Sequence, residues 1–195
     1  MANIASKFFK YRSYTPLPFL VLMFLYEDAN IWSLIIGFLI AMTGELIRLW
    51  GVSWAGSETR TTGTVGGTFL IVSGPFAHVR NPLYVGNILM YLGMGIMSMA
   101  VFPYLQIAAL LFFFVQYSYI VKEEEEYLRK TYGTEYAAFE KNVPRFFPRF
   151  SGYKTEGVEQ PAFSLKAGIK SETRTLQAFA AVSITIFLIW LIRRS

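Results

Sequence analysis

Apolar residues in this chain are gathered into five runs that are separated by polar segments. The runs lie near residues 16–26, 31–50, 82–102, 104–121 and 176–192. A helix needs about 20 predominantly apolar residues to cross a bilayer, and most of these runs come close to that length. Residues 108–115 are apolar on every face of a helix, unlike the one-sided pattern of a solvent-exposed bundle. The pattern therefore predicts an all-α integral membrane protein with about five transmembrane helices.

The order of the runs divides the chain into a membrane domain, a linker and a further anchor. Residues 1–154 hold the first four runs, residues 155–175 form a cytosolic linker, and residues 176–192 form an additional C-terminal transmembrane helix. The first run is short and needs a thin or tilted crossing. It does not end in a small-x-small cleavage site, so we interpret it as a helix that stays in the membrane rather than a cleaved signal.

Lys and Arg residues set the expected orientation of the helices. With five crossings, all but three of the 18 Lys and Arg residues fall on the side of the N-terminus and the two large loops. The positive-inside rule places that side in the cytosol. Arg193 and Arg194, at the far end of the last run, argue mildly against this orientation.

The fourth helix is expected to continue beyond the membrane. Residues 123–126 are four glutamates, and a helix that ended there would place them at its own negative pole. An extension to Gly133 puts Arg129 and Lys130 in the last turn and a glycine directly after them, as is typical of helix ends. The last turns of this helix would then carry the carboxylates into the cytosol.

Composition narrows the chemistry that the chain can perform. The sequence has no cysteine and a single histidine, His78, which excludes thiolate ligands, a cysteine nucleophile and a multi-histidine metal site. We therefore expect no metal. The net charge is +5, but the bases flank apolar runs and do not form a stripe interleaved with aromatic residues. This distribution favours anionic lipid headgroups over nucleic acid as the partner.

Two groups of polar residues are candidates for function. Arg48 lies inside the second apolar run, with Glu45 one helical turn earlier. The pair is either a structural ion pair at the membrane interface or part of a polar cavity that binds an anionic group. Neighbours on a helix point about 100° apart, so only some of the four glutamates can face the other helices.

The loop over residues 51–75 is rich in Gly, Ser and Thr, which is typical of a flexible connector. Its Gly63-x-x-Gly66-Gly67 segment lacks the preceding strand and the surrounding βαβ unit of a dinucleotide fingerprint. Any nucleotide-like cofactor must therefore bind in another way.

Five motifs follow one another in a characteristic order over about residues 68–150. They are Gly74-Pro75-Phe76, Arg80-Asn81-Pro82-Leu83-Tyr84-Val85-Gly86, Glu124-Glu125-x-x-Leu128, Tyr132-Gly133-x-x-Tyr136 and Val143-Pro144-Arg145-Phe146-Phe147-Pro148. With these motifs the chain resembles a prokaryotic member of the isoprenylcysteine carboxyl methyltransferase family, to which some phospholipid methyltransferases are related. Gly44-Glu45-x-x-Arg48 resembles an upstream element of the family.

The resemblance implies an enzyme that uses S-adenosylmethionine in a cytosolic region after the fourth helix. By analogy, Arg48 and Glu45 form the catalytic part of the site, which binds the methyl acceptor. The residues implied to bind the cofactor are Leu70, Ile71, Phe76, His78, Asn81, Pro82, Leu83, Tyr84, Glu124 and Glu125. The family usually has histidine at position 81 and commonly tyrosine at position 76. Asparagine cannot titrate, so either position 81 is a pocket residue rather than a base, which we favour, or the chain has lost activity.

Three enzymatic functions are compatible with the resemblance, and a non-catalytic scaffold is a fourth alternative. The first is methylation of the carboxylate of a prenylated cysteine or a similar lipophilic acid. The second is methylation of a phospholipid amine, for which Arg48 carries the wrong charge. The third is an NADPH-dependent sterol-type membrane reductase, whose cofactor would prefer a basic pocket over carboxylates. The membrane would be the plasma membrane of a prokaryote or the endoplasmic reticulum of a eukaryote.

Overall fold

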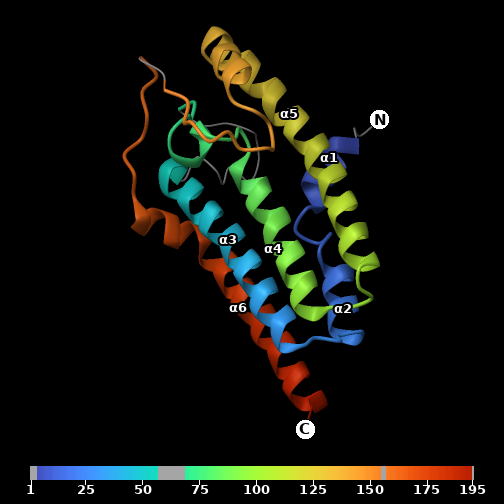
Figure 1. Ribbon diagram of the computed structural model, residues 1–195. Coiled ribbons are helices and arrows are strands. Elements are labelled where there is room, and N and C mark those ends of the chain that lie inside the picture. Colours follow the sequence, from blue (N-terminus) through green and yellow to red (C-terminus); the bar gives the residue numbers. More distant parts are fainter. Residues whose placement is uncertain (1–3, 57–68, 155–156, 195) are drawn as a thin grey trace. The chain divides into compact units, whose positions relative to one another are not determined.

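The computed structural model describes residues 4–56, 69–154 and 157–194, and in these ranges the regular structure is entirely helical (Figure 1). The elements in chain order are α1 (Ile4–Tyr11), α2 (Leu17–Leu25), α3 (Ile31–Ala55), the 3₁₀ helix η2 (Gly74–Ala77), α4 (Pro82–Ser98), α5 (Tyr104–Asn142) and α6 (Leu165–Arg194). Three of them, α3, α5 and α6, are long and apolar enough to cross a membrane, and α4 is a shorter apolar helix. The predicted all-α membrane class is confirmed.

Two helices extend further than the apolar pattern indicated. Helix α3 continues past residue 50 to Ala55. Helix α6 begins at Leu165, inside the predicted linker of residues 155–175. Its first turns are polar, so hydropathy did not distinguish them from a loop. The Ser164 hydroxyl accepts a hydrogen bond from the backbone N–H of Ala167 at 3.3 Å, which caps this start.

The third apolar run ends earlier than residue 102. Helix α4 stops at Ser98, and Met99 and Val101 then have positive φ angles of 51° and 46°. Such left-handed conformations interrupt a helix. The turn to α5 contains Pro103, which lies between the third and the fourth apolar run.

The break at Gly133 agrees with the predicted end of the fourth helix. Gly133 has φ 48° and ψ −116°, so α5 consists of two helical parts on either side of a kink. Glycine reaches a positive φ without the strain of a Cβ atom. The chain continues helically from the kink to Asn142, which the sequence pattern did not predict.

The chain forms two compact units. Unit 1 comprises Met1–Glu45, Asn87–Ile120 and Arg174–Ser195, and unit 2 comprises Leu46–Gly86 and Val121–Thr173. Helices α3, α4, α5 and α6 contribute one part to each unit. These units are interleaved in the sequence, and the proposed division into residues 1–154, 155–175 and 176–192 stays a prediction.

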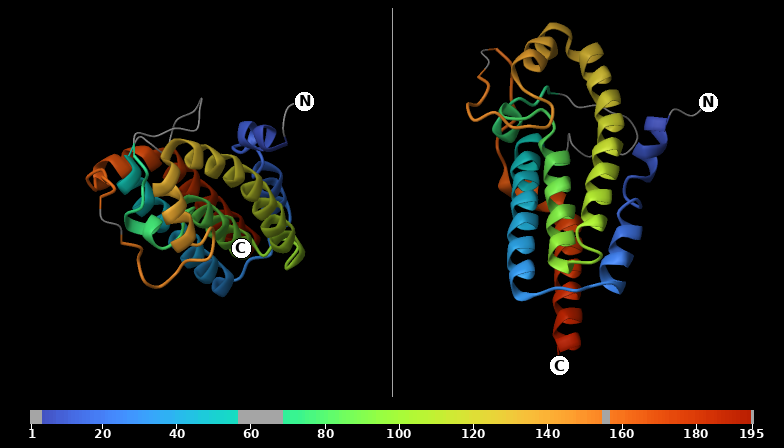
Figure 2. Two further views of the ribbon diagram at one scale, coloured as in Figure 1. Left: turned by 90° about the horizontal axis from the view of Figure 1, so that it is seen from above. Right: turned by 45° about the vertical axis from the view of Figure 1, so that its right-hand side comes forward.

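Unit 1 is a helical bundle whose connections are tied together at one end. The α2–α3 connection, the α4–α5 connection and the end of α6 lie at this end (Figure 2, right). The backbone N–H of Asp28 donates to the Ser98 carbonyl at 2.9 Å. Arg193 donates to the carbonyl oxygens of Glu27 and Leu25, and it also pairs with the buried Glu27 carboxylate. Arg193, which lies outside the side that holds most Lys and Arg residues, therefore has a structural role.

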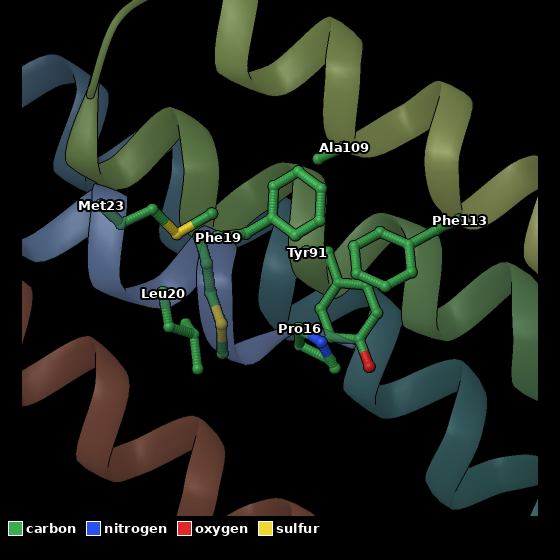
Figure 3. A pocket seen from close by; sticks show the side chains of 8 residues that line it. Pro16, Phe19, Leu20, Met23, Tyr91, Ala109 and Phe113 are labelled. Atoms are coloured by element: carbon green, nitrogen blue, oxygen red, sulfur yellow. The ribbon is translucent and has the colours of Figure 1, made fainter. Parts of the chain in front are cut away.

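A small hollow in unit 1 is part of its packed core. Apolar side chains from α2, α4 and α5 line it, among them Phe19, Met23 and Phe113 (Figure 3). Its free volume is about 10 Å³. A single water molecule already needs about that much space. We therefore do not regard this hollow as a ligand site.

The α3–α4 crossing in unit 1 gives a first prediction, because it depends on two glycines. A Cβ atom on Gly93 would lie 2.4 Å from the backbone nitrogen of Ala41 and 2.5 Å from the Gly37 carbonyl oxygen. Gly93→Ala should therefore force the helices apart and lower the free energy of unfolding by about 1–3 kcal/mol. Thermal unfolding in detergent measures this. Gly95→Ala is the matched control, because its Cβ would meet only the flexible Gln106 and Met23 side chains. Equal stability of both variants would contradict the close crossing.

Candidate functional site

The candidate site lies in unit 2, where the residues before α4 meet the second half of α5. Pro82 occupies the first turn of α4, a position that suits its fixed φ angle and missing N–H. The carbonyl of Asn81 accepts the N–H of Val85 at 3.2 Å, so Asn81 directly precedes the helix. The Arg80-Asn81-Pro82 turn is therefore rigidly joined to α4.

Glu125 binds this turn to α5. Its carboxylate is 1% exposed and accepts hydrogen bonds from Arg80 Nε at 3.0 Å and from Arg145 Nε at 3.2 Å. Terminal nitrogens of both arginines also pair with it, and Arg129 Nη2 lies 3.7 Å away. A buried carboxylate is stable when several charged donors surround it in this way. Glu125 thus holds three segments of unit 2 together.

Arg80 also closes the end of α5. Its Nη1 donates to the carbonyl oxygens of Glu140 at 2.7 Å and of Val143 at 3.1 Å. These carbonyls belong to the last turn of α5 and the residue after it, where no intrahelical donor follows. The backbone N–H of Arg80 donates to the Pro144 carbonyl at 2.9 Å. The arginine of the motif therefore has a structural function.

Glu124, the next carboxylate on α5, has different surroundings from Glu125. It is partly exposed, and Tyr84 on α4 donates its hydroxyl to Glu124 Oε1 at 2.7 Å. Asn81 Nδ2 donates to the Arg145 carbonyl at 3.3 Å and lies 3.5 Å from Glu125 Oε1. The motif that begins at Arg80 and the motif that begins at Glu124 are therefore in contact, through Tyr84 with Glu124 and through Asn81 with Glu125.

The segment before Gly74 is held by a residue that sequence reasoning missed. Gln160 Nε2 donates to the Leu70 carbonyl at 2.8 Å, and its Oε1 accepts the N–H groups of Val72 and Ser73 at 2.9 and 3.2 Å. Leu70 is buried, and Ile71 is partly exposed. Gly63, Gly66 and Gly67 of the predicted loop lie outside the described residues.

His78 and Phe76 closely precede the Arg80-Asn81-Pro82 turn in the chain, and His78 is fixed by two neighbours. His78 Nδ1 lies 2.9 Å from the Arg149 carbonyl oxygen, so a neutral ring carries its proton on Nδ1. Its ring centroid is 6.2 Å from that of Trp50 on α3. Phe76, like Leu83, is partly exposed, whereas Pro82 is buried.

Arg48 binds a carboxylate that the sequence analysis did not expect. Its Nη2 donates to both carboxylate oxygens of Glu172 on α6, at 2.9 and 2.8 Å, and Glu172 is 1% exposed. The start of α6 is docked closely here, because Ser164 N–H donates to the Ser53 carbonyl at 2.8 Å. Glu172 lies in a segment that hydropathy assigned to a linker, so no signal indicated it. Glu45 is 1% exposed and belongs to unit 1.

Beyond the kink at Gly133, two groups have shifted pKa values. Hydrogen bonds from Arg129 at 2.9 and 2.5 Å are the main reason why the pKa of Glu140 is lowered. The stabilisation from this ion pair is therefore present above the unfolded carboxyl pKa and is lost as pH falls through the lowered value. Burial is the main reason why the pKa of Tyr136 is raised.

Comparison with known proteins agrees with this arrangement of motifs. A model of the family described as phospholipid methyltransferase matches residues 32–135. A cobalt-zinc-cadmium resistance protein, CzcN, of Cupriavidus metallidurans is 34% identical over 111 residues, covering 56% of this chain and 46% of the relative. A nickel-cobalt-cadmium resistance protein, NccN, of Alcaligenes xylosoxydans xylosoxydans is 27% identical over 150 residues, covering 65% and 67%. The chain thus spans about half the length of the first relative.

Proposed function

Because this chain belongs to the phospholipid methyltransferase family, we propose that it transfers a methyl group from S-adenosylmethionine to a lipophilic acceptor at the cytosolic face of a membrane. The acceptor group that we propose is the carboxylate of a prenylated cysteine or a similar lipophilic acid. The observation that carries the proposal is the contact between the Asn81–Tyr84 segment and the adjacent carboxylates Glu124 and Glu125.

The residues at this contact suit the proposed cofactor. S-adenosylmethionine carries an amino group, ribose hydroxyls and a positive sulfonium, so it needs a carboxylate and an apolar wall. Glu124 offers the carboxylate and Tyr84 orients it, while the partly exposed Leu83 supplies apolar surface and the buried Pro82 fixes the start of α4. Glu125 is bound by arginines, so we assign it to positioning the turn rather than to the cofactor.

Bound S-adenosylmethionine would supply an activated methyl group. Transfer to a carboxylate needs no strong base, because the nucleophile is already ionised. The protein gains rate mainly by holding donor and acceptor in line. In this proposal Arg48 holds the acceptor carboxylate, a group that its guanidinium already binds in the form of Glu172.

The contact between Arg48 and Glu172 also favours a second candidate function. If Glu172 remains bound to Arg48 during turnover, the acceptor does not need a carboxylate, and a phospholipid amine becomes the better substrate. The family description agrees with this alternative. Because the family description names methyltransferases, the sterol-type reductase has the weakest support of the three enzymatic functions.

The relatives come from bacteria and are named for metal resistance, which suggests a plasma membrane and a physiological setting for this chain. Among the described residues no group of three or more His, Cys, Asp or Glu side chains could hold a metal ion. We therefore propose that any role in resistance acts through the methylated product.

Calorimetry with S-adenosylhomocysteine tests the proposed function. We expect the purified protein to bind it and to bind NADPH far more weakly. Glu124→Gln keeps the shape but loses a charge-assisted hydrogen bond, which should weaken binding by about 10- to 150-fold. Glu126→Gln is the matched control, because Glu126 pairs with Lys130 at the exposed surface. Unchanged affinity of Glu124→Gln would remove Glu124 from the site, and absence of binding to the unchanged protein would refute the cofactor.

Position 81 gives a further prediction. If Asn81 only shapes the pocket, Asn81→His should retain methyl transfer within about an order of magnitude and should not add a titration near pH 6.5. A pH–rate profile of both proteins measures this. A large gain in rate with a new pH limb would show that the unchanged chain lacks a catalytic base.

A further inference from the structure

The loop after α5, residues 144–150, exposes two of its three aromatic side chains. Phe150 and Phe147 have exposed fractions of 106% and 80%, the largest of the large hydrophobic side chains among the described residues. Large apolar side chains that are exposed close together on a protein surface mark an interaction site. The loop therefore needs a partner that covers apolar rings.

The backbone of the loop is fixed, so the exposure is a property of its folded conformation. Arg149 exchanges contacts with His78, because its N–H donates to the His78 carbonyl at 2.9 Å and its own carbonyl lies 2.9 Å from His78 Nδ1. Arg149 Nη1 also donates to the Asn142 carbonyl at 2.7 Å. On the far side of the loop, Tyr153 N–H donates to the Ala77 carbonyl at 2.8 Å. These bonds hold the rings outward at little further entropic cost.

The same bonds place the loop beside the start of the apolar helix α4. Ala77 and His78 take part in three of these contacts, and the apolar helix α4 begins at Pro82. Trp50, whose ring lies against His78, is 43% exposed. Tryptophan is enriched at the headgroup level of membranes. An apolar helix start and an exposed tryptophan are the neighbours expected of a loop at a membrane interface.

The charge of the loop selects among possible partners. Residues 141–154 contain four bases, Lys141, Arg145, Arg149 and Lys154, and no acidic residue. The hydrogen bonds of Arg149 go to a carbonyl and to the Ser151 hydroxyl, which are neutral groups. Basic residues beside exposed aromatic rings suit an anionic lipid surface, where the rings enter the acyl boundary and the charges stay with the phosphates.

We propose that residues 144–150 insert Phe147 and Phe150 into the cytosolic leaflet of the protein's own membrane, with Arg149 and Lys154 bound to anionic headgroups. The partner is a phospholipid surface and not a soluble protein or a second copy of the chain. This surface is separate from the residues proposed to bind the cofactor, and it does not depend on the proposed function.

Single-cysteine spin labelling tests the insertion, and the absence of native cysteine makes each label unique. Phe150→Cys is labelled in nanodiscs of phosphatidylcholine with phosphatidylglycerol. Lys130→Cys is the aqueous control and Leu111→Cys the lipid control, because both side chains are highly exposed, on polar and apolar parts of α5. Transfer of one phenylalanine ring into lipid corresponds to a partition ratio of at least about 10. We expect the label at 150 to be less accessible to a water-soluble nickel chelate than the label at 130 by about that factor.

Three results would overturn the proposal. The first is nickel accessibility at position 150 equal to that at position 130. The second is spin–spin broadening that appears only in discs with two copies, which would show a protein interface. The third is unchanged depth in pure phosphatidylcholine and in Arg149→Gln, which would remove the anionic headgroups. Phe147→Ser in the labelled Phe150→Cys protein should raise the nickel accessibility if both rings anchor the loop.

Discussion

Replacing Glu125 by glutamine is expected to cost the protein about 3–5 kcal/mol of stability, because it leaves a cluster of arginines without its central carboxylate. Arg80, whose side chain is 9% exposed, cannot recover its hydration by turning outward. Arg145 and Arg129 are more exposed and can partly return to water. We therefore expect Arg80 to be the main source of the loss, together with the turn and the end of α5 that it holds.

The adjacent glutamate supplies a matched comparison. Glu124→Gln makes the same chemical change one residue earlier, where Tyr84 is a hydrogen-bond donor that an amide oxygen can still satisfy. Thermal unfolding in detergent should show a much lower midpoint for Glu125→Gln and a nearly unchanged midpoint for Glu124→Gln. At temperatures at which both variants are folded, Glu124→Gln should bind S-adenosylhomocysteine more weakly than Glu125→Gln does. A stable Glu125→Gln protein would refute the structural role of the arginine cluster.

Features of the fold that depend on local chemistry could be predicted from the sequence. Pro82 starts α4 and Gly133 breaks α5, because each residue has backbone preferences that its neighbours do not alter. Long apolar runs identified α3 and the first half of α5, because about 20 consecutive apolar residues predict a membrane helix. The contact between the Arg-Asn-Pro turn and the glutamates was implied by the motifs, but the different surroundings of Glu124 and Glu125 required the orientation of the helix.

Features that depend on polar contacts distant in sequence could not be predicted. Gln160 and Glu172 lie in polar segments with no periodic apolar pattern, and each acquires its role from a partner about 90 or more residues away. The start of α6 was assigned to a linker because a polar helix gives no hydropathic signal. Arg48 was therefore paired with Glu45, its neighbour along the chain, and Glu172 was not considered.

Arg48 decides between the two proposed acceptors, and Glu172 makes the decision measurable. Arg48→Lys retains the positive charge but loses the planar guanidinium that can grip a carboxylate through two hydrogen bonds. If Arg48 holds the acceptor, this variant should fold, bind S-adenosylhomocysteine normally and lose about 100-fold in kcat/KM for a prenylcysteine acid, the order of a misplaced reactant. Aggregation or lost cofactor binding would instead make Arg48 structural.

Glu172→Gln supplies the reciprocal test, because it removes the internal carboxylate while Arg48 remains. An acceptor that competes with Glu172 for Arg48 should then bind more readily, and its KM should fall while the KM for S-adenosylmethionine stays unchanged. Both proteins must first be shown to unfold cooperatively, since Glu172 is buried and its loss leaves Arg48 without this partner. Wild-type rates with the acid in Arg48→Lys, together with an unchanged KM in Glu172→Gln, would refute the carboxylate acceptor. The Arg48–Glu172 pair would then be a link between α3 and α6, and the phospholipid amine would be the acceptor to test.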